Sequence, residues 1–464
     1  MDITERLLKH ITSVNYEDLP MEVVVAGKRS VMDTLGVLLA GSSRPGAKEI
    51  AELVKEWDGK AESTVLVYGG MVPAHEAVLA NSTMARALDF DDLHVNAGVH
   101  PSATIVPVAL ATAELRGKVS GKELITALVL GIDVTIRLRL VPDFCLAVSG
   151  WVGEVHSTFG AAATAGKILG FTQEKMSNAL GIAYSQAAGT VQAFDDGALV
   201  TRVQQGFAAR SGLLAAVLAG KGITAAKNFL EGRAGFYPVY YRGINYDVNR
   251  LVDGIGEKYE ALNLAIKPYP SCGFTHAAIE NVSTIMQQNQ LSEGDIDEVL
   301  LRVNQRMYNN VCQPVETRYR PQTIVDAMFS LPYTVGTAML RGDVFLEDFT
   351  DEAIKDSERL KMTDKVKIVV DEDIDKESIK LNLPLSLHVA EIKTKSGKSF
   401  SQKMLYVKGY PQKPMTLEDC ALKLRRCVPF AAKSFSEGRV NQLIEMVKDL
   451  EQLEDVTSLI KLLY

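Results

Sequence analysis

Three stretches in the first half of the chain combine helical spacing with a high density of Ala, Gly and Ser. They are STFGAAATAGKILG from residue 157, TQEKMSNALGIAYSQAAG from residue 172 and QQGFAARSGLLAAVLAGKG from residue 204. Small side chains let helix axes approach closely, so a helix with small residues on most faces is expected to be surrounded by other helices. The sequence therefore predicts a helical domain with these stretches at its centre.

The remaining sequence before about residue 250 also has mostly helical spacing. PMEVVVAGKRSVMDTLGVLLAG has apolar residues at helical intervals and stops at Gly41. SGKELITALVLGIDVTIRLRL opens with Ser120 and Glu123, which form the pattern of a capping box. We therefore expect nearly everything from residue 1 to about residue 250 to be helix.

After about residue 265 the pattern changes to alternating apolar and polar residues. This alternation is found in EVLLRVN near residue 298, KVKIVVDED near residue 365, and LSLHVAEIKTKSGKSFSQKMLYVKG from residue 385. Ser396-Gly397 lies between two alternating arms and predicts a hairpin. Two helices are expected among the strands, one beginning near Thr275 and one interrupted by Pro332.

Helical spacing returns from about residue 415 to the end of the chain. The tail is therefore expected to pack back on the first domain. The sequence predicts a mainly α fold with a discontinuous all-helical domain at residues 1–265 and 408–464. A smaller α+β lid domain is predicted at residues 266–407.

Composition excludes several classes of function. The net charge of −7 argues against a protein that binds nucleic acids or acidic membranes, because such proteins carry basic clusters. The amino-terminal sequence lacks the apolar segment of a secretion signal. Five cysteines without a CxxC pair are typical of reduced thiols. A cytoplasmic protein is therefore expected.

The stretch ALDFDDLHVNAGVHPSATIVP concentrates titratable residues between two apolar runs. Asp89, Asp91 and Asp92 lie within four positions, and His94 and His100 follow. One interpretation is a solvated loop at the end of a helix. A second is a metal site, although the spacing matches neither an EF-hand loop nor a zinc pattern. A third is a set of groups that transfer protons.

Three further polar places remain unexplained by composition. His156 precedes one of the small-residue helices, and a lone histidine there is also compatible with a hydrogen-bonded core residue. Arg202 and Gln204 begin another such helix, where an arginine is often only a surface charge. In AIKPYPSCGFTHAAIE, two prolines lie between charged or nucleophilic residues at the change of domain, and those residues are Lys267, Cys272 and His276.

Taken together, these motifs resemble one family over nearly the whole chain. The order of ALDFDD, HPSA, FGAAATAGKILG, ALGIAYSQAAG, FLEG, KPYPSC and FSLPY is similar to that of the MmgE/PrpD family. That family includes 2-methylcitrate dehydratases, cis-aconitate decarboxylases and iminodisuccinate epimerases. The resemblance implies a large helical domain with a smaller α+β lid, a homodimer, no metal or organic cofactor, and a site between the domains.

The resemblance also implies roles for individual residues. The implied catalytic residues are Asp89, His100, His156 and Lys267, and the implied substrate-binding residues are Asp92, His94, Arg202, Gln204, Cys272 and His276. The chain departs from the decarboxylase branch in four ways. Leu93 replaces a threonine, one extra residue precedes His100, Arg202 replaces a lysine, and Cys272 replaces a histidine. Each change alters the hydrogen bonding available to a bound carboxylate.

The reading favoured by the sequence is a cofactor-independent hydro-lyase that acts on a small di- or tricarboxylate. An arginine can bind a carboxylate through two hydrogen bonds, and histidines can move the proton next to it. An epimerase, isomerase or decarboxylase of the same family is the alternative. A metal-dependent hydrolase and an inactive helical scaffold are the readings from other classes. We expect His100 and Lys267 to face the same substrate.

Overall fold

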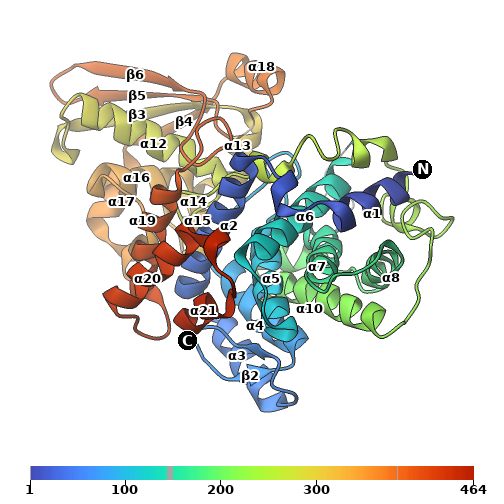
Figure 1. Ribbon diagram of the computed structural model, residues 1–464. Coiled ribbons are helices and arrows are strands. Elements are labelled where there is room, and N and C mark those ends of the chain that lie inside the picture. Colours follow the sequence, from blue (N-terminus) through green and yellow to red (C-terminus); the bar gives the residue numbers. More distant parts are fainter. Residues whose placement is uncertain (1, 144–149, 384) are drawn as a thin grey trace. The chain divides into compact units, whose positions relative to one another are not determined.

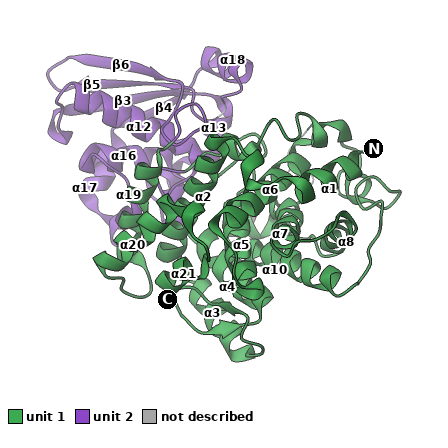
Figure 2. Cartoon of the chain, in the orientation of Figure 1, with its two compact units in different colours: residues 1–266, 415–464 green, residues 267–414 purple. Residues whose placement is uncertain are grey.

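The computed structural model describes residues 2–143, 150–383 and 385–464, and in it the chain forms two compact units (Figures 1 and 2). Unit 1 comprises Met1–Ile266 and Met415–Tyr464, and unit 2 comprises Lys267–Pro414. Helices make up most of the regular structure in the described residues, which confirms a mainly α fold. The four cysteines in this part of the chain are free thiols, and Cys145 lies outside it.

Unit 1 consists of helices and one short two-stranded sheet. Its helices are α1 (Ile3–Ser13), α2 (Met21–Gly41), α3 (Ala47–Trp57), α4 (Ala74–Arg86), α5 (Ser102–Arg116), α6 (Gly121–Leu140), α7 (Glu154–Ile168), α8 (Gln173–Tyr184), α9 (Gln192–Asp195), α10 (Val200–Gly220), α11 (Phe236–Tyr240), α19 (Leu417–Cys427), α20 (Glu437–Lys448) and α21 (Thr457–Ile460). Strands β1 (Ser63–Thr64) and β2 (Met71–Val72) pair antiparallel.

The small-residue helices lie where the sequence predicts them. Helix α10 packs against α4, α5, α7 and α8. At Gly212 of α10 an added Cβ would lie 2.5 Å from the carbonyl oxygen of Thr158 on α7, so only glycine permits this approach. The capping box of α6 is also confirmed. The Ser120 hydroxyl accepts from the Glu123 amide at 3.3 Å, and the Glu123 carboxylate accepts from the Ser120 amide at 2.8 Å.

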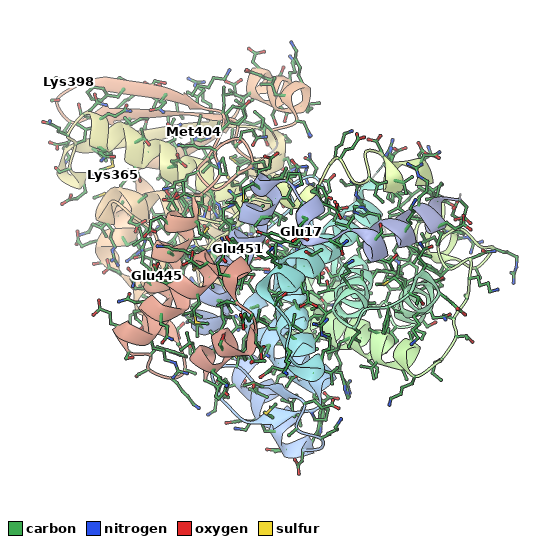
Figure 3. The ribbon with its side chains drawn as sticks, viewed as in Figure 1. Glu17, Lys365, Lys398, Met404, Glu445 and Glu451 are labelled. Carbon is green, nitrogen blue, oxygen red and sulfur yellow. The ribbon has the colours of Figure 1, made fainter. Side chains whose placement is uncertain are left out.

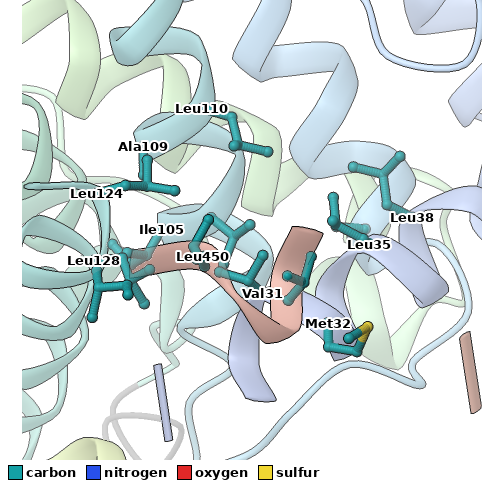
Figure 4. Close-up of a cluster of buried hydrophobic side chains, with 14 of the residues drawn as sticks. Val31, Met32, Leu35, Leu38, Ile105, Ala109, Leu110, Leu124, Leu128 and Leu450 are labelled. Carbon is teal, nitrogen blue, oxygen red and sulfur yellow. The ribbon is translucent and has the colours of Figure 1, made fainter. Parts of the chain in front are cut away.

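The C-terminal segment, residues 415–464, belongs to the core of unit 1. Helix α19 packs against α2. Leu450 is fully buried in the same apolar cluster as Val31 and Leu128, as Figure 4 shows. The next residue, Glu451, which is labelled in Figure 3, forms an ion pair with Lys28 of α2. The distance between Oε2 of Glu451 and Nζ of Lys28 is 2.5 Å. This segment therefore supplies both apolar and charged contacts to helices from the beginning of the chain.

The expectation that nearly everything up to about residue 250 is helix is wrong for residues 221–249. Apart from α11 and part of a short 3₁₀ helix (Val248–Val252), this region consists of turns and bends. Gly222 and Gly243 adopt φ angles of 91° and 80°, which a right-handed helix cannot accommodate. Tertiary contacts therefore decide the path of the chain here, because the glycines remove the local preference for helix.

Unit 2 combines a four-stranded sheet with helices. Its strands are β3 (Ile296–Val303), β4 (Val366–Val370), β5 (His388–Thr394) and β6 (Ser399–Met404), in the spatial order β4-β3-β5-β6. Its helices are α12 (Gly273–Gln288), α13 (Gln305–Val311), α14 (Val315–Tyr319), α15 (Ile324–Met328), α16 (Leu331–Arg341), α17 (Ser357–Asp364) and α18 (Glu372–Leu381). Strands β3 and β4 are parallel, whereas β5 is antiparallel to both β3 and β6.

Two local predictions for unit 2 are confirmed. Strands β5 and β6 form a hairpin around Ser396-Gly397, and Gly397 has the positive φ of 84° that its turn requires. The helical pattern around Pro332 is interrupted, with α15 ending at Met328 and α16 beginning at Leu331. Ser330 caps α16, and Pro332 lies in its first turn, where its missing N–H costs no helical hydrogen bond. None of the helices in the described residues has the length and apolarity needed to cross a membrane.

Candidate functional site

The acidic stretch forms a loop between the end of α4 and the beginning of α5. Its first acid, Asp89, has a φ of 49°, the left-handed conformation that aspartate tolerates better than most residues. The Asp89 amide donates to the carbonyl oxygen of Arg86 at 3.2 Å, so the chain turns back over the end of α4. This turn directs the acids of the loop towards the last side chain of that helix.

Arg86, Asp89, Asp91 and His100 form one charged cluster. Nη1 of Arg86 lies 2.5 Å from Oδ1 of Asp89 and 3.2 Å from Oδ1 of Asp91. Nδ1 of His100 lies 3.3 Å from Oδ2 of Asp91, and its Nε2 lies 4.0 Å from Oδ1 of Asp89. The His100 side chain is 14% exposed, whereas that of Asp91 is 1% exposed. The structure thus brings together two of the residues expected to be catalytic, Asp89 and His100.

Arg86 is a member of the cluster that the sequence analysis did not single out. Burial alone would lower its pKa, but the carboxylates of Asp91, Asp89 and Glu154 raise the pKa above its ordinary value. The guanidinium therefore stays charged and fixes the two acids of the loop. The available signal was its position three residues before Asp89, which on a helix end places both side chains on the same face.

Three residues of this cluster, Asp89, Asp91 and His100, also have the donor types of a metal site. Ligand atoms of Asp89, Asp91 and His100 lie within 4.8 Å of one another, so the donor types are suitable for a cation. Arg86, however, already places a positive charge against both carboxylates. A metal ion bound there would be repelled by this guanidinium and would have to displace it. The arrangement therefore favours an ion-pair cluster over a metal centre.

Asp92, the third acid of the loop, is fully buried. Its carboxyl group accepts hydrogen bonds from the amide and hydroxyl of Ser102, at the beginning of α5. Burial raises the pKa of Asp92 to about 8, although the hydrogen bonds from Ser102 lower it. The charges of Asp33 and Asp91 raise the pKa further. Asp92 is therefore mostly protonated at neutral pH. Its predicted contact with substrate stays a prediction.

His94 holds the turn that leads to His100. Its Nδ1 accepts from the Ala97 amide at 3.0 Å, so the ring proton is on Nε2, which lies 3.3 Å from the Glu260 carboxylate. Burial would raise the pKa of Glu260, but hydrogen bonds from His94 and Asn263 lower it. Both ring nitrogens of His94 thus contact protein groups. The contact with substrate expected for His94 stays a prediction.

A lysine from the C-terminal segment supports the loop from the interior. Nζ of Lys423, on α19, donates to the carbonyl oxygen of Phe90 at 2.8 Å and lies 2.6 Å from Oδ1 of Asp33 on α2. It also lies 3.7 Å from the centre of the Phe90 ring. Lys423 and Asp33 are both buried. Phe90, which stands between the two acids of the cluster, is therefore anchored by a residue 333 positions away in the sequence.

His156, on α7, lies in an aromatic environment. Its Nδ1 lies 3.1 Å from the carbonyl oxygen of Gly153, which can only accept, and its Nε2 lies 2.7 Å from the Tyr241 hydroxyl, which therefore donates. The Phe236 ring meets it edge-on at 5.3 Å. Burial, followed by the charge of Arg139, holds the pKa of His156 well below its usual range. His156 is therefore neutral, and its catalytic role stays a prediction.

Helix α10 contributes polar residues next to His100. Gln205 donates to the carbonyl oxygen of His100 at 2.7 Å and to the Thr104 hydroxyl at 2.5 Å. Three residues earlier, Nη1 of Arg202 donates to the carbonyl oxygen of Pro45 at 2.8 Å. Gln204, one of the residues expected to bind substrate, donates to the carbonyl oxygen of Thr190 at 3.0 Å, and the substrate contacts of Arg202 and Gln204 stay predictions. Gln205 was missed because two adjacent glutamines give no sequence signal of which one faces the site.

The remaining predicted residues belong to unit 2. Lys267 is its first residue and is 3% exposed. Cys272 is the N-cap residue of α12, and His276 lies in the first turn of that helix. Nε2 of His276 is 3.0 Å from the carbonyl oxygen of Ser271, and its ring meets that of Tyr269 edge-on at 5.6 Å. Cys272 and His276 thus lie at the beginning of one helix, and the roles of all three residues stay predictions.

The arrangement in unit 1 can move a proton. Asp91 and Asp89 orient the His100 imidazole, and Arg86 fixes both acids. Gln205 and Lys423 hold the backbone carbonyl groups of His100 and Phe90, and Glu260 holds the side chain of His94. A general acid or base needs this kind of orientation, because its contribution depends on reaching the transferred proton.

Comparisons with known proteins agree with this organisation. The MmgE/PrpD N-terminal domain matches residues 5–249, and the MmgE/PrpD C-terminal domain matches residues 269–452. Cis-aconitate decarboxylase of Aspergillus terreus is 26% identical over 484 residues, covering 99% of this chain and 96% of that protein. Cis-aconitate decarboxylase of Homo sapiens is 28% identical over 479 residues, covering 99% of this chain and 94% of that protein. The corresponding protein of Mus musculus is 26% identical over 477 residues.

Proposed function

The chain belongs to the MmgE/PrpD family, and from that premise we propose that it is a cofactor-independent lyase acting on a small di- or tricarboxylate. The observation that carries this proposal is the pairing of His100 with Asp91 and Asp89, held by Arg86. An oriented imidazole next to fixed charges is suited to proton transfer at a carbon beside a carboxylate.

The reaction that we propose first is loss of water. A proton is removed from the carbon next to a carboxylate, and the adjacent carbon loses its hydroxyl group. The electrons of the C–H bond form the new C=C bond, and the hydroxyl takes a proton and leaves as water. His100 is the proposed proton-transfer group, and Asp89 and Asp91 are its positioning residues. A positioned acid or base contributes typically about 10²–10⁴-fold to such a step.

Loss of carbon dioxide is the second candidate. It is favoured by the relatives in Aspergillus terreus, Homo sapiens and Mus musculus. These relatives are cis-aconitate decarboxylases, and the similarity covers nearly their whole length. Leu93, an apolar side chain in the acidic loop, favours the first candidate, because the resemblance places a threonine hydroxyl there in the decarboxylase branch. An epimerase would share the initial proton abstraction.

Two expectations from the sequence remain part of the proposal. Lys267 provides positive charge for the same substrate as His100, in keeping with the lid role proposed for unit 2. The protein works as a homodimer, which light scattering at micromolar concentration would test.

One experiment distinguishes the candidate reactions. The protein is incubated in D₂O with citrate-like, aconitate-like and aspartate-derived acids, and proton NMR is recorded over time. Dehydration gives a new vinyl signal without carbon dioxide, decarboxylation releases carbon dioxide, and epimerisation exchanges one C–H for C–D. We expect dehydration of at least one hydroxylated acid. The lyase proposal is contradicted if none of these acids changes, provided that circular dichroism shows a folded protein.

A further inference from the structure

Among the buried polar atoms of unit 1 that make no hydrogen bond within the described residues are Nε of Arg44, Nε of Arg86, Oγ1 of Thr201 and Oε1 of Gln205. Buried polar groups in folded proteins are nearly always paired, so a group of unpaired ones calls for an explanation. Their joint occurrence next to a proton-transfer group points to a polar ligand that would complete them.

Arg44 reaches this region from the loop that follows α2. An added Cβ at Gly41, the last residue of α2, would lie 2.0 Å from the carbonyl oxygen of Met84, so the end of α2 rests directly against α4. Met84 lies two residues before Arg86. The loop then continues through Pro45, whose carbonyl oxygen accepts from Nη1 of Arg202 at 2.8 Å. Arg44 and Arg202 thus meet at one loop, beside the charged cluster.

The charges of these side chains are not balanced within unit 1. Arg86 has Asp89 and Asp91 as partners. In the part of the chain that the structure describes, neither Arg44 nor Arg202 forms an ion pair with a carboxylate. Burial lowers the pKa of both arginines, and the neighbouring charges of Arg44 and Arg86 lower that of Arg202 further. Half-buried guanidinium groups that repel one another would be stabilised by an anion between them.

We propose that Arg44 and Arg202 together bind a carboxylate group of the substrate, at a point remote from the carbon whose proton His100 transfers. Each guanidinium can donate two parallel hydrogen bonds to a carboxylate, which fixes both its position and its plane. Thr201 and Gln205 supply further polar contacts beside it. The proposal rests on the proposed function for the reaction itself. To the substrate-binding role already expected of Arg202 it adds Arg44, and it assigns the pair to the remote carboxylate.

The test uses ligand binding, which does not require turnover. Succinate, glutarate, butanoate and inorganic phosphate are titrated into the full-length protein by calorimetry. Arg44→Gln should weaken binding of succinate or glutarate about 10- to 100-fold, because it removes charged hydrogen bonds, and should change butanoate binding less than about twofold. Arg44→Lys keeps the charge but loses the planar guanidinium group that donates two parallel hydrogen bonds. Its affinity for succinate or glutarate should lie between those of Arg44→Gln and the unchanged protein.

Lys48→Gln is the matched control. Lys48 lies four residues after Arg44, and its exposed ammonium group contacts only Glu52, at 3.7 Å, among the ion pairs of the described residues. This variant should bind all four probes like the unchanged protein. Melting curves of every variant exclude loss of folding as the cause, and Arg44→Lys keeps the test decisive if Arg44→Gln does not fold.

Three results would overturn the subsite. Unchanged affinity of Arg44→Gln and Arg44→Lys for both dicarboxylates would show that Arg44 binds no carboxylate. Equal losses for glutarate and butanoate would place Arg44 at the reacting carboxylate instead of the remote one. Phosphate binding tighter than either dicarboxylate, and lost in Arg44→Gln, would identify a phosphate site. If the dicarboxylates bind as expected but no acid is turned over, the subsite stands and the proposed reaction fails.

Discussion

His100 and His156 are both expected from the sequence to be catalytic, but the structure gives them opposite surroundings. His100 faces two carboxylates, and a guanidinium contacts both of them. His156 faces a hydroxyl, a carbonyl oxygen and an aromatic ring, and it is neutral. Residues whose environments differ in this way commonly divide the roles of acid and base between them. The comparison suggests that the two histidines do not substitute for each other.

The largest effect is expected from His100→Gln. Glutamine keeps a polar side chain of similar size but cannot transfer a proton, so turnover of the true substrate should fall about 10²–10⁴-fold. Melting temperature should change little, because the imidazole is partly exposed and glutamine keeps a polar group next to the two carboxylates. His75→Gln is the control, since His75 contacts Glu76 outside the cluster. Retention of near-native turnover in His100→Gln would break the comparison.

The next effect concerns the support beneath the loop of His100. Lys423→Met leaves the buried carboxylate of Asp33 without its cation, which typically costs about 3–5 kcal/mol of stability. Amide hydrogen exchange should also become faster in the segment 88–102, because the hydrogen bond to the carbonyl oxygen of Phe90 is lost.

Lys28→Met provides the matched control for Lys423→Met. It removes another ion pair between α2 and the C-terminal segment, that with Glu451. It should lower stability without faster exchange in the segment 88–102. Equal exchange in the two variants would mean that Lys423 only stabilises the fold and does not position the loop.

A smaller effect is expected around His156. His156→Gln should lower turnover about 10²-fold if the imidazole itself transfers a proton, which is the catalytic role that the sequence predicts. Tyr241→Phe removes only the hydroxyl that donates to Nε2, so it should lower the stability of the protein by about 1–3 kcal/mol. Its loss of turnover should be much smaller than that of His156→Gln. Equal turnover in the two variants would show that His156 has a structural role, and the contrast with His100 would then be complete.

The last effect concerns the pH dependence of stability and not turnover. The pKa of Asp92 is about 8 in the folded protein and is expected near its ordinary value of 3.8 when the chain is unfolded. Between these values the folded state binds the extra proton, so stability falls as pH rises. Asp92→Asn removes this dependence, with a limiting slope of about 1.4 kcal/mol per pH unit. Urea unfolding at pH 5 and pH 8 measures it, and parallel changes in both proteins would contradict the prediction.

The elements that could be predicted are those specified by neighbouring residues. The capping box of Ser120 and Glu123 and the hairpin at Ser396-Gly397 involve contacts over three to sixteen positions, and both are confirmed. The close packing of α7 and α10 also follows from their own small residues, such as Gly212. The parallel pairing of β3 with β4 could not be predicted in the same way, because 62 positions separate the end of one strand from the beginning of the other and no local signal fixes their register.

Some residues of the candidate site could likewise be predicted from the sequence, and others could not. Asp89 and His100 could be found because acids and histidines are rare between apolar runs. Arg44, Arg86 and Lys423 could not, because an arginine or lysine on a helix or in a loop is usually a surface charge. Only the folded chain shows that Lys423 is buried against Asp33 and that Arg44 lacks a carboxylate partner in the described residues.

The anchoring of Phe90 by Lys423 has a consequence for the order of events during protein synthesis. At typical rates of translation the ribosome needs roughly 15–70 s to add the 333 residues between them. During that time Asp33 on α2 does not yet have the ammonium group of Lys423 beside it, although most of the helices around it have already been synthesised. The nascent chain can therefore collapse early, but it acquires an ordered acidic loop only when its last 50 residues, 415–464, leave the ribosome.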